Sequence, residues 1–246
     1  MNTSHADERE SDSGAPEDST LAEKAAEKVK ALVTSVVMDG VGPLTGSRAY
    51  AEARLSQLQR DRYVAGTDGI REYREADEAD IEKVIDRLIG ESTGAAGVSG
   101  FVTSLGGLIT LPITLPANLA GALVINARLA GAIAYLRGWD VEDPHTQTVI
   151  MVVALGTSVQ NAMKTLGLKV GEKAAAAALR KLPIAVLRDI NKRVGFMLLA
   201  KYGGKRAVLT LSRMIPVISG FIGGAVDAAM TNLVGRTAKK LFERVS

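Results

Sequence analysis

Two charged residues interrupt apolar stretches of the chain and are its strongest candidates for chemistry. Arg128 lies in the otherwise uncharged segment 125–130, and Asp227 lies in the otherwise uncharged segment 223–229. An ionised side chain in such surroundings needs a partner, because an unpaired buried charge is strongly destabilising. We expect a buried Arg128–Asp227 pair that fixes the register of two helices. The alternative is a polar ligand pocket lined by both residues together with Thr114, Asn118 and Asn126.

Residue types exclude several other kinds of site. The chain has no cysteine, which excludes disulfides, thiolate nucleophiles and cysteine-ligated metals. His5 and His145 are the only histidines, too few for a histidine metal site or relay. The glycine-rich segment 40–47 has neither the spacing nor the lysine of a phosphate-binding loop. The sequence predicts no catalytic residue, metal or cofactor, and it favours a protein that is not an enzyme.

Positive charge is concentrated at the C-terminal end. Segment 1–20 has a net charge of −5, and segment 21–163 has −4. Segment 164–246 holds 16 basic and 4 acidic side chains, a net charge of +12. Such a segment attracts anionic headgroups or nucleic acid, but its few aromatic residues argue against nucleic acid. The cations expected to contact lipid are Lys169, Lys173, Lys181, Arg188, Lys192, Arg193, Lys201, Lys205 and Arg206.

The elements that must position these residues are helices. Apolar residues recur at helical spacing between 21 and 37 and again between 81 and 88, and no segment alternates with the period of a strand. Asp143-Pro144 is typical of a helix start, which explains the nearby acidic residues better than metal binding does. Segment 1–20 is polar and acidic and has no features of a signal peptide. We therefore expect a disordered tail over 1–20 and one all-α domain over 21–246.

Residues 92–127 carry no formal charge and include Pro112 and Pro116. They contain no convincing stretch of roughly 20 apolar residues, the length that a membrane-spanning helix needs. One interpretation is a set of buried helices in which small residues allow close backbone contact. The other, which the sequence favours, is a proline-broken hairpin that enters one leaflet beside basic helices. The spacings Gly90/Gly94 and Gly220/Gly224 suggest close helix packing.

Several segments in order resemble the EcsC protein family. The matching pieces are 111–116, 138–144, 181–183, 190–196 and 216–227, so the resemblance covers about 88–245. It implies a bacterial protein whose namesake is encoded beside the parts of an ABC transporter. It implies no reaction and no catalytic residues.

Together these features predict a membrane-associated helical protein on the cytoplasmic side of the cell membrane, peripheral or re-entrant. Its partners would be an anionic lipid surface or a membrane protein, with an ABC transporter complex as one such partner. The alternative is a soluble helical enzyme or lipid-handling protein with a polar pocket around Arg128 and Asp227. A third option is an adaptor for an integral membrane complex. The sequence does not predict an oligomeric state.

Overall fold

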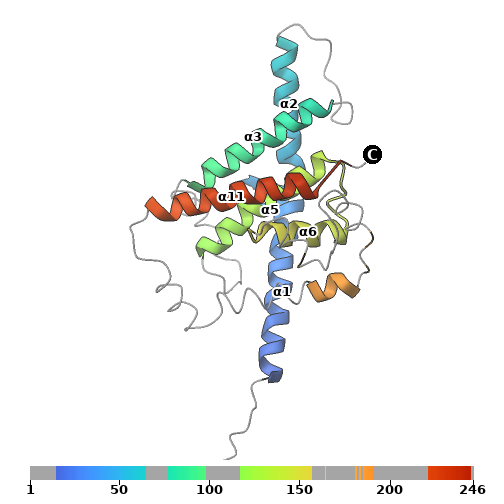
Figure 1. Ribbon diagram of the computed structural model, residues 1–246, viewed down its shortest axis with the longest axis vertical. Helices are drawn as coiled ribbons and strands as arrows, with labels where there is room; N and C mark the ends of the chain where they lie inside the picture. Colours follow the sequence, from blue (N-terminus) through green and yellow to red (C-terminus); the bar gives the residue numbers. More distant parts are fainter. Residues whose placement is uncertain are drawn as a thin grey trace, which may run out of the picture.

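The computed structural model describes residues 15–64, 77–97, 117–156 and 221–244, together with 164, 181, 183 and a helical segment at 185–190. The elements (Figure 1) are α1 (Ala15–Met38), β1 (Gly40–Val41), β2 (Leu44–Thr45), α2 (Ser47–Val64), α3 (Glu78–Gly97), α5 (Ala117–Leu136), α6 (Pro144–Ala154) and α11 (Phe221–Leu241). Apart from the ribbon of two-residue strands, these elements are helices. The predicted all-α class is confirmed.

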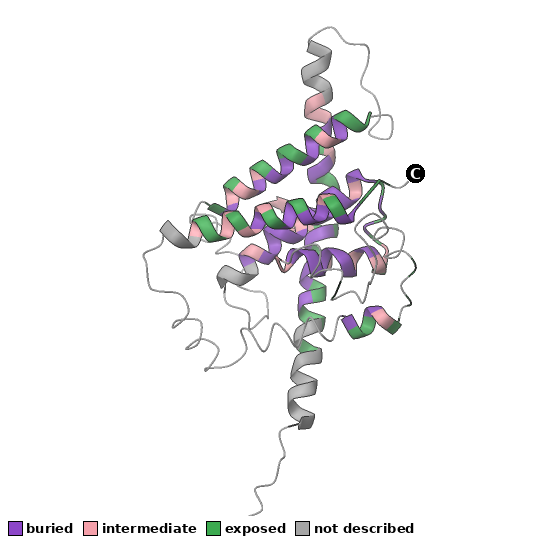
Figure 2. Cartoon of the chain, in the orientation of Figure 1, coloured by how far each residue is buried: buried purple, intermediate pink, exposed green. Residues whose placement is uncertain are grey.

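Helix α5 forms the centre of the described bundle, because α1, α2, α3, α6 and α11 all pack against it. Between residues 121 and 134, all side chains are buried except those of Ala122 and Arg128. A helix that is apolar all round is expected to be buried on all sides. Figure 2 shows the same burial along α6, whose residues 148–154 are all buried.

Helices α5 and α6 lie in the interior of the described bundle. Both contribute to its hydrophobic core, as the interpretation of buried helices predicts for these two parts of the chain. Residues 98–116, with Pro112 and Pro116, lie outside the described residues. Among the described helices, none combines the length and the hydropathy that crossing a bilayer requires.

Helix α1 begins earlier than the sequence analysis predicts. The sequence predicts a start near Leu21 after a disordered tail, but the helix starts at Ala15. The physical reason lies in Pro16, Glu17 and Asp18, since proline and acidic residues are favoured in the first turn of a helix. The predicted apolar stripe of this helix is confirmed, with these members buried in the core: Val29, Leu32, Val33, Val36 and Val37.

A tight ribbon connects α1 to α2 where the sequence predicts only a break. Strands β1 and β2 pair antiparallel, with Gly40 opposite Thr45 and Val41 opposite Leu44. Gly40 and Gly42 have φ values of +86° and +60°, which only glycine adopts readily. A Cβ atom on Gly40 would collide with the carbonyl oxygen of Leu44. The two glycines therefore fix the position of Thr45 beside α5.

The helix start at Asp143-Pro144 is confirmed. Pro144 is the first residue of α6, and the Asp143 carboxylate accepts a hydrogen bond of 2.9 Å from the backbone N–H of Thr146. Hydrogen bonds from Thr146 and His145 lower the pKa of Asp143 below its ordinary value, against the opposing effect of partial burial. Asp143 thus serves as a helix cap.

Glycines allow close helix contacts, but not at all the positions predicted. A Cβ on Gly224 of α11 would collide with the carbonyl oxygen of Gly97 on α3, so these two backbones touch. Gly90 and Gly94 are exposed, and a Cβ added at either would have no neighbour within 4 Å, so their predicted packing role is wrong. Gly220 lies outside the described residues. Helix α5 approaches α2 closely at Gly131, where an added Cβ would lie 2.9 Å from the Cβ of Ser47.

The Gly131 contact predicts opposite effects for two glycine substitutions. We expect Gly131→Ala to lower the free energy of unfolding by about 1–3 kcal/mol, because the added methyl group overpacks the buried Ser47. Gly90→Ala, in open space on α3, should raise it by up to about 1 kcal/mol through helix propensity. Urea unfolding of both variants measures this difference. Equal effects from the two substitutions would contradict the close α2–α5 contact.

Candidate functional site

An open cleft of about 490 Å³ lies between α2, α3, α5 and the end of β2. Its lining combines apolar small residues with four large polar side chains. On α2, Tyr50 and Arg54 are four residues apart and therefore share a face, as Glu91, Gly94 and Ala95 do on α3. The complete lining is Thr45, Tyr50, Ala53, Arg54, Glu91, Gly94, Ala95 and Arg128.

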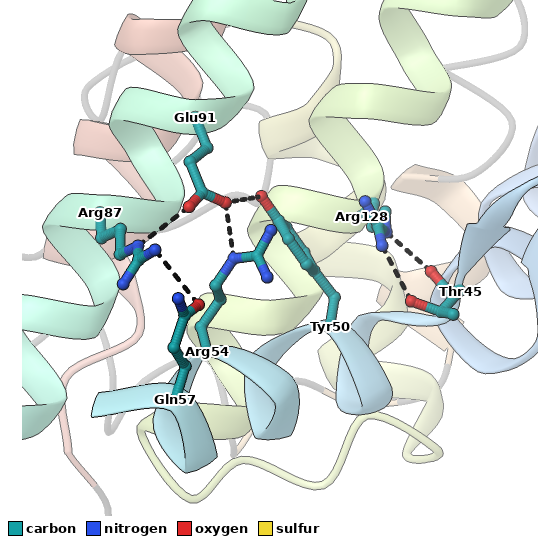
Figure 3. Close-up of polar contacts among 7 residues, drawn as sticks. All are labelled: Thr45, Tyr50, Arg54, Gln57, Arg87, Glu91 and Arg128. Carbon is teal, nitrogen blue, oxygen red and sulfur yellow. Dashed lines mark hydrogen bonds and ion pairs between the residues drawn. The ribbon is translucent and has the colours of Figure 1, made fainter. Parts of the chain in front are cut away.

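Glu91 is the centre of a hydrogen-bonded group in this cleft (Figure 3). Its Oε2 accepts hydrogen bonds from Arg54 Nε at 2.7 Å and from the Tyr50 hydroxyl at 3.3 Å. Its Oε1 accepts from Arg87 Nε at 3.0 Å, and Arg87 also donates to Gln57 at 3.2 Å. Partial burial alone would raise the pKa of Glu91, but the hydrogen bonds from Arg54 and Arg87 bring it below its ordinary value. Glu91 is therefore an ionised carboxylate that ties α3 to α2.

Arg128 enters the cleft from the central helix. Its Nε donates to the carbonyl oxygen of Thr45 at 2.7 Å, and its Nη2 donates to the Thr45 hydroxyl oxygen at 2.9 Å. Its guanidinium lies 3.8 Å from the ring centre of Tyr50, a distance typical of a cation–π contact. Partial burial lowers the pKa of Arg128, and the nearby Arg54 acts in the same direction. Both hydrogen-bond acceptors of Arg128 are neutral, while the charge of the Glu91 carboxylate acts to raise the pKa of this partly buried cation.

The predicted Arg128–Asp227 pair is wrong, and helix geometry explains why. The Asn126 side chain donates to the Ala154 carbonyl at 3.2 Å and accepts from Thr231 at 2.9 Å, so this face of α5 meets α6 and α11. Arg128 is two residues further on, about 200° around the helix. It lies on the side that faces α2. Asp227 has no ion pair with a described residue, and partial burial raises its pKa above the ordinary value.

Contacts along α5 confirm which face Arg128 shares. Gly131 packs against Ser47 at the start of α2, and the Tyr135 hydroxyl donates to Glu52 of α2 at 2.6 Å. Residues 128, 131 and 135 have the spacing of one helix face. Arg128 thus belongs to the α2 side, far around the helix from α11.

Of the five residues predicted for a polar pocket, Arg128 alone is described as lining the cleft. Asn126 is buried, as expected, but it joins α5 to α6 and α11. Thr114 lies outside the described residues, and so does the side chain of Asn118. The sequence analysis missed Tyr50, Arg54 and Glu91, because they come from separate helices. The four-residue spacings Tyr50/Arg54 and Arg87/Glu91 were the signal that could have found them.

The cations predicted to contact lipid are only partly described. Lys181 and Arg188 are both exposed, as a lipid contact requires. The remaining seven lie outside the described residues: Lys169, Lys173, Lys192, Arg193, Lys201, Lys205 and Arg206. Helix α11 adds exposed cations that the sequence analysis did not select, Arg236 and Lys240.

The chemistry available in the cleft is that of donors and positive charge. Arg54 and Arg87 bond to the Glu91 carboxylate and Arg128 lies on the other side of Tyr50, so three cations accompany one carboxylate in this group. Burial also raises the pKa of Tyr50, which keeps its hydroxyl protonated. In the described part of the chain, no group of three or more acidic, histidine or cysteine side chains converges as a metal site would require. The arrangement is suited to holding an anion.

The lowered pKa of Glu91 predicts a pH-dependent contribution to stability. Its ion pairs should stabilise the protein fully above the pKa of glutamate in the unfolded chain, and this contribution should be lost as pH falls through the lower folded-state pKa. The difference in unfolding free energy between the parent protein and Glu91→Gln should therefore shrink as pH falls from neutral into the acid range. Urea unfolding across pH measures it, with exposed Glu243→Gln as control. A difference that stays constant with pH would contradict the ionised Glu91.

Comparison with known proteins gives one result that concerns nearly the whole chain. The model of the EcsC protein family matches residues 11–245. Searches among curated proteins and among solved structures give no match. The family match begins well before residue 88, where the resemblance in sequence was expected to start. It therefore includes α1 as well as Thr45 and α2, which contribute to the lining of the cleft, and the chain belongs to the EcsC protein family.

Proposed function

We propose that this protein is a non-enzymatic, peripheral membrane protein that attaches to anionic lipid on the cytoplasmic side of the cell membrane. The observation that supports this proposal is the solvent-facing stripe of α11. Exposed residues recur there at intervals of three and four positions, in this order: Val226, Ala229, Leu233, Arg236 and Lys240. We call these five residues the α11 stripe.

The α11 stripe is apolar at one end and cationic at the other. Val226 is 54% exposed and Leu233 is 36% exposed, which makes them two of the few large hydrophobic side chains at the described surface. The opposite face of the same helix is buried in the core through Val234, Ala238 and Leu241. Helices at a membrane surface typically combine exposed apolar residues with lysine and arginine. The α11 stripe has this composition.

Further exposed cations come from the same C-terminal segment. The described ones are Lys164, Lys181, Arg188, Arg236, Lys240 and Arg244. Each basic residue close to an anionic membrane contributes about 1 kcal/mol, so a few acting together give firm attachment. Lys239, next to Lys240 in α11, pairs with Glu82 at 2.8 Å and with Asp86 at 2.6 Å. Attachment through exposed cations should weaken in salt, which screens charges.

The burial of α5 and α6 limits how attachment can occur. These apolar helices contribute to the protein core, so the proposal relies on the surface and not on an uncharged centre that enters lipid. The alternative function was a polar pocket around Arg128 and Asp227. Of these two residues, Arg128 lines the cleft and Asp227 does not. An ABC transporter complex as partner stays a prediction.

The test is flotation of the protein with liposomes. Parent protein should float with vesicles that contain anionic lipid at low salt, and it should dissociate at a salt concentration of about 1 M, where charges are screened over a few ångströms. Arg236→Gln/Lys240→Gln should lower the partition coefficient about 30-fold, since two contributions of about 1 kcal/mol are removed. Val226→Ser/Leu233→Ser should also reduce binding, because it removes apolar area from the interface.

A matched control comes from α1. Lys24 and Lys28 are also exposed and four residues apart, so Lys24→Gln/Lys28→Gln removes the same charge from another surface. This variant should float like the parent protein. The proposal fails if the parent protein does not bind anionic vesicles at low salt. It also fails if Lys24→Gln/Lys28→Gln loses as much binding as Arg236→Gln/Lys240→Gln.

A further inference from the structure

We propose that the cleft between α2, α3 and α5 is a binding site for a phosphate group, which is held by the guanidinium groups of Arg54 and Arg128. The phosphate belongs either to a soluble phosphorylated molecule or to a phospholipid headgroup. Both present the same anionic oxygens to the arginines. This inference is independent of attachment through the α11 stripe.

Arg128 donates its hydrogen bonds to neutral oxygens, and the nearby Glu91 carboxylate acts on it only through its charge. Arg128 is one of only two residues between 121 and 134 of α5 that are not fully buried, and its hydrogen bonds go to the carbonyl and hydroxyl oxygens of Thr45. A partly desolvated cation that bonds to no carboxylate is unfavourable unless an anion completes the site. An anion in the cleft would supply such a charged acceptor.

The guanidinium groups of Arg54 and Arg128 both lie against the ring of Tyr50. Arg54 and Arg128 lie 5.5 Å and 3.8 Å from the ring centre of Tyr50. Glu91 accepts from the Nε of Arg54, and neither Nη of Arg54 bonds to another described residue. Figure 3 shows the Tyr50 ring between the guanidinium groups of Arg54 and Arg128. An anion in the cleft that reaches both cations would offset their repulsion and accept hydrogen bonds from these N–H groups.

The directions from which the remaining donors approach favour a phosphate over a carboxylate as the bound anion. Glu91 already supplies a planar carboxylate to Arg54 and Arg87. The remaining donors come from two helices, α2 and α5, and therefore approach an anion from different directions. A phosphate monoester carries a charge of about −1.5 to −2 and three acceptor oxygens, whereas a carboxylate has two oxygens in one plane. Donors that converge from two sides match the tetrahedral anion better.

The cleft is large and open enough to hold more than a free phosphate ion. Its volume of about 490 Å³ is larger than a free phosphate needs and lies within the usual range for small-molecule sites. Gly94 lies in the wall, and nothing is within 4 Å of the position that a Cβ would take there. The cleft therefore has space for the group to which the phosphate is attached.

Isothermal titration calorimetry with soluble ligands tests the site without membranes. The probes are inorganic phosphate, dihexanoyl phosphatidic acid below its micelle concentration, and acetate. Parent protein should bind inorganic phosphate or the short-chain lipid more tightly than acetate. Arg128→Gln should weaken this binding at least ten-fold, because it removes one of the two guanidinium groups that hold the phosphate. Gly94→Leu should weaken it to a similar extent by filling the cleft, with every arginine retained.

Gly90→Leu is the matched control for Gly94→Leu. Both glycines are exposed on α3, four residues apart, and both have open space at the Cβ position, but Gly90 does not line the cleft. Gly90→Leu should bind phosphate within two-fold of the parent protein. If Arg128→Gln fails to fold, the two leucine variants still decide the question.

Each outcome of the titrations has a definite meaning. Equal affinity for the two phosphate probes supports a soluble phosphorylated ligand, and tighter binding of the short-chain lipid supports a headgroup. The proposal is overturned if neither phosphate probe binds, if acetate binds as tightly, or if Gly94→Leu binds as well as Gly90→Leu. None of these results depends on flotation, so failure of this site and failure of membrane attachment are distinguishable.

Discussion

The enclosure of α5 is the constraint on which the rest of the described structure depends. This helix carries a single formal charge, Arg128, in a segment whose other side chains are almost all buried. Burying a lone arginine within a helical core would be prohibitive. The bundle therefore has to open at the position of Arg128, and α2, α3 and the β1–β2 ribbon surround that opening. The location of the cleft follows from the one residue of α5 that cannot enter the core.

Polar contacts on opposite sides of α5 hold this helix in one orientation. Asn126 bonds to the Ala154 carbonyl and to Thr231, while Arg128 bonds twice to Thr45. An apolar surface alone would tolerate rotation of the helix, since its hydrophobic residues are similar on every side. The two polar side chains remove that freedom, because rotation would break the bonds of Arg128 to Thr45 and leave the buried Asn126 and Thr231 without these partners. The end of α11 is fixed in a comparable way by Trp139, which donates to the Glu243 carbonyl at 2.8 Å and packs against Phe242.

The parts of the fold that could be predicted from sequence are those with local signals. The apolar stripes of α1 and α3 and the helix start at Asp143-Pro144 depend on neighbouring residues only. The faces of α5 could not be predicted, because a helix that is apolar all round has no periodicity to show which side meets which neighbour. For this reason the sequence pairs Arg128 with Asp227 and not with Thr45. The predicted role of Gly90 and Gly94 is wrong for a related reason, since the spacing of two glycines does not say whether another helix lies opposite.

The position of Thr45 gives the N-terminal helix an influence on the arginine cleft. One hydrogen bond from Arg128 ends on the backbone carbonyl of Thr45, which no substitution of that side chain removes. The ribbon that carries this carbonyl follows directly after the 24 residues of α1, and part of α1 extends beyond the bundle (Figure 1). A tilt of that long helix would shift the ribbon and, with it, the oxygen that holds the guanidinium in place. The position of the guanidinium therefore depends on how α1 packs in the bundle, although α1 contributes no residue to the lining of the cleft.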